Sequence, residues 1–212
     1  MNPTLLGAIG GYYNSVCGVT VSVAPTRNTY LSYGFYDGNV ARGAQTGMMG
    51  PKFNGYYFNI WEAGIDWVIG EKYPGQFGAG LWHQTGVLQG PNGASQNGTG
   101  RCYMFGGHRI SCNSHNRASP DGKSKVVVST LDNREYASIS TFFQFGVNNS
   151  ETLPVNQYFG MGLTGFGLVP HRSEDSMGVG MAWSWLNPNL FDRSSELMFQ
   201  GYYQAHLFAG PR

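Results

Sequence analysis

The sequence predicts an all-β fold of antiparallel strands, and three features of its pattern carry that prediction. Glycine, proline and asparagine divide the chain into segments of about 8 to 14 residues. Within the segments, apolar and polar residues alternate with the period of two that is typical of a β-strand. No segment has a clear apolar stripe with the 3.6-residue period of a helix. Such evenly spaced strands with turn signals between them indicate a sandwich or a barrel.

Nine strands and a short tenth one are expected along the chain. The expected ranges are 4–13, 17–24, 28–37, 56–69, 75–88, 134–147, 157–169, 176–187 and 196–208, with the short strand at 125–130. The stretch at about 89–133 is polar and rich in Gly, Asn and Ser, so we expect most of it to be one long loop. We interpret residues 1–212 as a single domain.

The first half of the chain has its apolar side chains at odd positions in three of the expected strands. These are Leu31, Tyr33 and Phe35, then Trp61, Ala63, Ile65 and Trp67, then Phe77, Ala79 and Leu81. The even positions place Glu62 and Asp66 together on the opposite face, with Gly64 between them. Two bare carboxylates are costly in a buried core, so this face is expected to be wet.

The second half repeats the alternation in four strands. Its apolar positions include Phe143 and Phe145, Phe159, Met161 and Leu163, Val179, Met181 and Trp183, and Leu197 and Phe199. The opposite positions carry glycine and polar residues, among them Arg134, Gln144, Glu196, Gln200, Gln204 and His206. Every strand is therefore expected to have one apolar face and one polar or small face.

Three details favour a membrane-spanning barrel over a soluble sandwich. The polar faces carry Gly, Ser and Gln, whereas the lysines fall in loops or at strand margins. The strands are longer than the usual five or six residues and match the 9 to 11 tilted residues that cross a bilayer. Aromatic pairs such as Tyr56–Tyr57 and Tyr202–Tyr203 lie near strand ends, as in interfacial girdles. A soluble sandwich that binds carbohydrate is the alternative left open by these arguments.

The composition excludes several other classes. Charged residues make up 12% and aromatic residues 15%, which is the opposite of a disordered chain. A net charge of +1 argues against nucleic acid as a partner. No run of 18 apolar residues predicts a transmembrane helix, and the first residues do not have the pattern of a signal peptide. We expect no enzyme, since no nucleophile elbow or supported carboxylate pair is evident.

The cysteines leave two readings open. Cys102 and Cys112 lie ten residues apart in the expected loop, where they are either reduced thiols or a disulfide in an oxidising compartment. A zinc site with His108 and His115 is conceivable, but the spacing fits no standard finger. We predict no metal and no cofactor.

Four stretches carry a resemblance to a known family. They are "YLSYGFYDGNVARGAQTG" (30–47), "YYFNIWEAGIDWVIGEKYPGQFGAGLWHQTG" (56–86), "YFGMGLTGFGLVPHRSEDSMGVGMAWSWL" (158–186) and "SELMFQGYYQAHL" (195–207). In their order and spacing they resemble the carbohydrate-selective porins of Gram-negative outer membranes, the OprB family. The second and third stretches are the most specific.

The resemblance implies an outer-membrane barrel of roughly sixteen antiparallel strands, embedded in lipid and lipopolysaccharide. It implies passive diffusion of monosaccharides such as glucose into the periplasm, with a homo-oligomer as one arrangement. This chain supplies only nine or ten of those strands, so we expect it to be a piece of a larger porin that lacks early and closing strands. An outer-membrane protein without a useful pore is a further alternative.

A porin has no catalytic residue, and its side chains work by lending weak hydrogen bonds and stacking faces to a passing sugar. The residues predicted to line the pore and contact sugar are Glu62, Asp66, Trp82, Gln84, Arg134, Gln144, Glu196, Gln200 and Gln204. Asp37 and Arg42, and likewise Arg172 and Asp175, belong either to a constriction or to simple turns. For Arg172 and Asp175 the simpler reading is that they pair with each other. The long loop is expected to be extracellular, where it either narrows the pore or shields its mouth.

Overall fold

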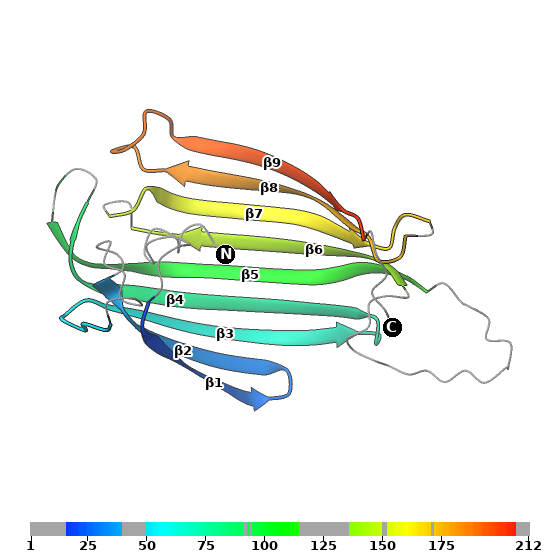
Figure 1. Cartoon of the computed structure of the whole chain (residues 1–212), viewed down its shortest axis with the longest axis horizontal. Coiled ribbons are helices and arrows are strands. Elements are labelled where there is room, and N and C mark those ends of the chain that lie inside the picture. Colours follow the sequence, from blue (N-terminus) through cyan, green and yellow to red (C-terminus); the bar gives the residue numbers. More distant parts are fainter. Residues whose placement is uncertain are drawn as a thin grey trace, which may run out of the picture.

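The computed structural model describes residues 16–39, 50–90, 93, 95–114, 136–149, 152–170 and 172–206. Its nine strands form one sheet in which each strand pairs with the next along the chain (Figure 1). The strands are β1 Gly18–Thr26, β2 Thr29–Asp37, β3 Tyr57–Ile69, β4 Tyr73–Gln89, β5 Ser95–Ser114, β6 Tyr136–Val147, β7 Val155–Phe166, β8 Ser176–Leu186 and β9 Ser195–Gln204. All eight pairings are antiparallel. The prediction of an all-β antiparallel fold is confirmed.

Eight of the expected strands match observed ones to within a few residues. The expected strands at 4–13 and 125–130 lie outside the described residues. In the part of the chain that the structure describes, the strands form a single layer and not the two packed sheets of a sandwich. No helix there is long and apolar enough to cross a membrane.

The prediction of one loop over about 89–133 is wrong for residues 95–114. They form β5, the longest strand at 20 residues, which pairs with β4 on one side and β6 on the other. The segment is polar and carries four glycines, so its intrinsic strand propensity is low. Its two neighbours satisfy its backbone hydrogen bonds, and that pairing decides its conformation.

The two faces of the sheet differ in the way the alternation predicts. We call the face that carries Glu62 the inner face and the face that carries Trp61 the outer face. On the outer face large apolar side chains are open to the surroundings, with Trp61 exposed by 45% and Leu81 by 59%. On the inner face Phe58, Trp82 and Tyr103 are buried. This is the reverse of a soluble sheet, whose apolar face is covered and whose polar face meets water.

A tight turn joins β3 to β4. Gly70 and Glu71 both adopt left-handed backbone angles, with φ of 56° and 61°, and the Lys72 amide donates to the Ile69 carbonyl at 3.4 Å. Positive φ at both central residues is the geometry of a type I′ hairpin turn. It sets the register in which Glu62 lies opposite Gly80.

Candidate functional site

Glu62 accepts hydrogen bonds from two tyrosines in the middle of the inner face. The Tyr30 hydroxyl of β2 donates to Oε1 at 2.8 Å, and the Tyr103 hydroxyl of β5 donates to Oε2 at 2.6 Å. We call these three residues the Glu62 triad. The triad joins strands β2, β3 and β5, so it braces the wall across three hairpins.

Glycine makes room for the two tyrosine rings. A Cβ at Gly64, two residues after Glu62, would lie 2.2 Å from the Tyr30 ring. A Cβ at Gly80, the cross-strand partner of Glu62, would lie 2.4 Å from the Tyr103 ring. Real Cβ atoms cannot come so close, and only glycine lets the rings lie flat on the wall and reach the carboxylate.

The chemistry of the triad follows from its donors. Both tyrosine O–H groups point at the carboxylate, and no described Lys, Arg or His forms an ion pair with Glu62. A carboxylate has about four lone-pair positions, and the phenol oxygens can also accept. The triad can therefore accept further hydrogen bonds from a solute while its own donors are already used.

The predicted polar residues of the other strands share the face of Glu62. One cross-strand row runs from β1 to β9 through Ser22, Ser32, Glu62, Gly80, Tyr103, Gly146, Tyr158, Ser184 and Glu196. Directly opposed residues of an antiparallel pair project to the same side. The same registers place Asp66, Gln144, Gln200 and Gln204 on the inner face. Arg134 and Arg42 lie outside the described residues.

Trp82 and Gln84 lie on the inner face too, but both are buried, at 2% and 0% exposure. The Trp82 ring stacks on Phe58 with centroids 5.8 Å apart, and Leu153 and Tyr103 complete the cluster. The Gln84 amide donates to the carbonyls of Gly38, at 3.2 Å, and Thr85, at 3.0 Å. The predicted stacking surface of Trp82 is thus covered by protein in this structure.

Asp37 anchors the segment between β2 and β3. It is fully buried and accepts hydrogen bonds from the backbone amides of Asn39 at 3.0 Å, Lys52 at 2.6 Å and Phe53 at 3.2 Å. Phe53 has a left-handed φ of 43°, a strained angle that this carboxylate holds in place. Both Asp37 oxygens bind the polypeptide itself, so its geometry is that of a loop anchor.

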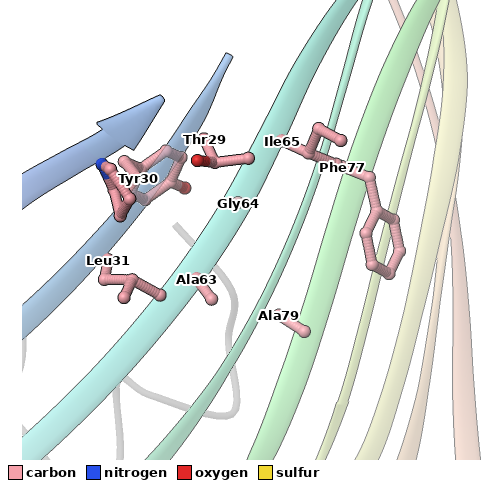
Figure 2. A pocket seen from close by; sticks show the side chains of 9 residues that line it. Thr29, Tyr30, Leu31, Ala63, Gly64, Ile65, Phe77 and Ala79 are labelled. Atoms are coloured by element: carbon pink, nitrogen blue, oxygen red, sulfur yellow. The ribbon is translucent and has the colours of Figure 1, made fainter. Parts of the chain in front are cut away.

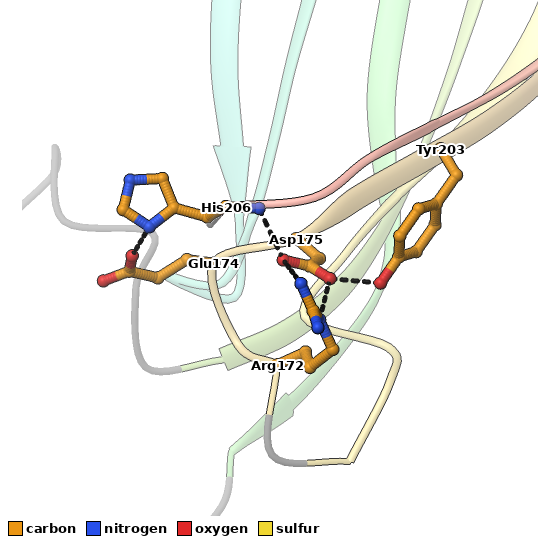
Figure 3. A network of polar contacts seen from close by, with 5 residues as sticks. All are labelled: Arg172, Glu174, Asp175, Tyr203 and His206. Atoms are coloured by element: carbon orange, nitrogen blue, oxygen red, sulfur yellow. Dashed lines mark hydrogen bonds and ion pairs between the residues drawn. The ribbon is translucent and has the colours of Figure 1, made fainter. Parts of the chain in front are cut away.

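Asp175 is the hub of a second polar cluster, at the turn between β7 and β8 (Figure 3). Its carboxylate pairs with Arg172, accepts from the Tyr203 hydroxyl of β9, and accepts from the His206 amide at 2.9 Å. Beside it, His206 Nδ1 lies 2.6 Å from Glu174 Oε2. The expected pairing of Arg172 with Asp175 is therefore observed, and it ties the turn to the end of β9.

The contacts of this second cluster shift the pKa values of Asp175 and Arg172. The Arg172 guanidinium, then the Tyr203 hydroxyl and the His206 amide, lower the pKa of Asp175 from 3.8 to about 2. The hydrogen bond to Asp175 correspondingly raises the pKa of Arg172. Asp175 is consequently ionised and neutralised by its partner over the whole physiological range.

The disulfide reading is wrong for this structure. Cys102 and Cys112 are reduced and lie on the same extended strand, β5. At about 3.3 Å per residue their Cα atoms are roughly 30 Å apart, whereas a disulfide needs about 6 Å. The same separation rules out a zinc site built on both thiols, and the described residues contain no metal-binding group of His, Cys, Asp and Glu. His115 lies outside them.

The sequence pattern does not identify several inner-face residues, because it predicts a loop where the structure has β5. Tyr103, Arg101 and Arg109 all lie on this face, and Arg101 stands opposite Trp82. Tyr30 has an even position in its expected strand, so the alternation assigns it to this face, but the sequence gives it no role. The available signal was the alternation of Arg101, Tyr103 and Phe105 with smaller or apolar neighbours.

The outer face has a shallow apolar groove of about 460 Å³ (Figure 2). Its floor follows the cross-strand row Leu31, Ala63 and Ala79, beside the row Thr29, Ile65 and Phe77. The full lining is Pro25, Thr29, Tyr30, Leu31, Ala63, Gly64, Ile65, Phe77 and Ala79. An apolar groove on the apolar side offers a sugar no hydrogen-bonding groups, so it is not a candidate site for a polar solute.

Comparison with known proteins gives a family match and a structural match. Residues 1–207 match the family described as carbohydrate-selective porin, OprB family. Among solved structures, the high pH structure of Pseudomonas putida OprB is similar with a TM-score of 0.67 at 17% sequence identity. The match covers 87% of this chain and 43% of that one, so this chain spans less than half the length of that protein. No curated protein matches the chain.

Proposed function

Because the chain belongs to the carbohydrate-selective porin family, OprB, we propose that the whole protein is an outer-membrane porin for passive diffusion of monosaccharides such as glucose into the periplasm. The observation that carries this proposal is the reversed pair of faces. Exposed Trp, Leu, Ile and Phe side chains suit a wall in contact with hydrocarbon. The opposite face carries carboxylates, amides and glycine, which suit a watery lumen.

Closure of the sheet completes the proposal. In lipid every backbone group must be satisfied within the protein, and only a closed barrel does that with strands. Further strands would pair with β1 and β9, the two edges of the described sheet. The channel activity therefore belongs to the whole protein.

The inner face supplies two kinds of weak contact to a neutral sugar. The Glu62 triad and Asp66 accept hydrogen bonds from sugar hydroxyls, and the amides of Gln144, Gln200 and Gln204 both donate and accept. These groups replace part of the hydration of the sugar without trapping it, as passage requires. Glu196 and Arg134 are proposed to belong to the same lining.

Liposome swelling tests the proposal. The whole protein, reconstituted into vesicles, is expected to admit glucose faster than a disaccharide of the same osmolarity. A folded, membrane-inserted protein that admits neither sugar would instead support a structural role. Staying in the aqueous fraction without detergent would contradict the membrane assignment itself.

A further inference from the structure

Leu153 reaches the inner face from the connection between β6 and β7. It is exposed by only 6% and packs on Phe58 of β3, Trp82 of β4 and Tyr103 of β5. The residue thus covers an aromatic surface made by three strands to which its own segment does not belong.

The connection is fastened on two sides. The hydroxyls of Thr152 and Thr99 hydrogen-bond to each other at 2.7 Å, which ties the connection to β5. On the other side Asn187 donates from Nδ2 to the Leu153 carbonyl at 3.0 Å and from its backbone to the Pro154 carbonyl at 2.9 Å. Leu153 is therefore held in place by bonds on both of its flanks.

Two buried polar atoms of β4 have no hydrogen-bond partner among the described residues. They are the indole Nε1 of Trp82, a donor within the cluster that Leu153 covers, and the Oε1 of Gln84, an acceptor whose amide lies against Gly38. The two residues are neighbours on the same face of β4. Buried polar atoms nearly always have partners, so the orphaned Trp82 donor under Leu153 points to a ligand with a hydroxyl group.

We propose that Leu153 occupies the place of a sugar ring on a saccharide subsite formed by Phe58 and Trp82. The stacked rings offer an apolar platform to the C–H face of a pyranose, and the indole N–H can donate to one of its hydroxyls. Because Leu153 fills the subsite, this part of the inner face binds sugar weakly, and Leu153 thereby sets its affinity for sugar. This inference rests on the proposed sugar-conducting function.

Intrinsic fluorescence of the whole protein in detergent, titrated with glucose, tests the subsite. Leu153→Ala is expected to lower the Kd for glucose about tenfold, the size of one well-made polar contact regained. Leu153→Val, which removes one methylene, is expected to give a smaller shift in the same direction. Leu190→Ala is the matched control, because Leu190 lies in the β8–β9 connection and is 46% exposed. Adding Trp82→Phe to Leu153→Ala should remove the gain in glucose affinity, because it deletes the indole N–H donor.

Swelling assays on the same preparations separate this inference from the proposed function. A wild-type protein that admits glucose, with Kd unchanged in both Leu153 variants, would overturn the subsite and leave the porin standing. Failure of every variant to admit sugar would overturn the porin. If Leu153→Ala does not fold, the Leu153→Val titration decides, since the loss of a single methylene is well tolerated in most cores.

Discussion

Among the described residues, two carboxylates accept hydrogen bonds from tyrosines, and their surroundings differ. Glu62, in the middle of the inner face, accepts from two neutral phenols of β2 and β5. Asp175, at the β7–β8 turn, accepts from the Tyr203 phenol and the His206 amide but also pairs with Arg172. A tyrosine hydroxyl thus donates to a carboxylate in both clusters, but of the two carboxylates only Asp175 also pairs with a cation.

This difference suggests different roles: Glu62 is available to a solute, whereas Asp175 has a structural role. Neutral donors orient the Glu62 carboxylate but leave its full negative charge directed at the inner face. A guanidinium beside Asp175 cancels most of that charge locally, so the second cluster has little to offer a passing solute. Its effect is to fasten the turn before β8 to the end of β9.

The largest expected effect separates Glu62 from its neighbour Asp66. Glu62→Ala should lower the free energy of unfolding by about 3 kcal/mol, since it removes two hydrogen bonds to a charged group at about 1.5 kcal/mol each. Asp66→Ala is the matched control, because Asp66 lies on the same strand and face and is exposed. It should cost less than about 0.5 kcal/mol. Urea titration in detergent micelles measures both, and equal losses would contradict a special role for the triad.

The next effect tests whether the triad acts as a unit. Tyr103→Phe should cost about 1.5 kcal/mol in the wild-type protein, because it deletes one donor to Glu62 and keeps the ring over Gly80. In the Glu62→Ala background the same substitution should cost less than about 0.5 kcal/mol, giving a clear coupling energy in a double-mutant cycle. Additive losses would mean that the tyrosine stabilises the wall by packing alone.

The sequence predicts which side chains share a face of the sheet more readily than it predicts which residues hydrogen-bond to Glu62. The parity of β3 alone puts Glu62 and Asp66 opposite Trp61 and Ile65, since side chains alternate strictly along a strand. Tyr30 and Tyr103, in contrast, lie 32 and 41 residues from Glu62. Their approach depends on the register of three hairpins, and a single sequence does not specify registers across a missed strand.

Leu153 illustrates a second kind of limit. A lone leucine in a polar connection has no periodicity to interpret, and its burial depends on where the chain turns after β6. Trp82 is predicted to face the lumen, and in the structure it lies on the same face as Glu62. The sequence does not predict that Leu153 covers the Trp82 ring, because Leu153 lies about 70 residues further along the chain.

A smaller effect concerns the pH dependence of the Asp175 cluster. Because the pKa of Asp175 is lowered to about 2 in the folded protein, its contribution to stability is fully present above its unfolded value of 3.8. That contribution is lost as the pH falls through 3.8 toward 2. Asp175→Asn should therefore flatten the acid limb of a stability-against-pH curve, and the loss at pH 7 should be smaller than for Glu62→Ala. An unchanged acid limb would show that other carboxylates control it.

The smallest effect is expected at the exposed edge of the same cluster. His206 and Glu174 are both largely open to solvent, so their contact at 2.6 Å is screened and entropically costly to hold. His206→Gln keeps the backbone amide that donates to Asp175, and should change the free energy of unfolding by less than about 0.5 kcal/mol. Arg193→Gln, which removes the exposed Arg193–Glu196 pair at the other end of β9, is the matched control. His206→Gln could instead lower the free energy of unfolding by more than this, even in 1 M salt, where the Debye length is about 3 Å. That result would mean that the imidazole positions the His206 amide and is part of the Asp175 cluster.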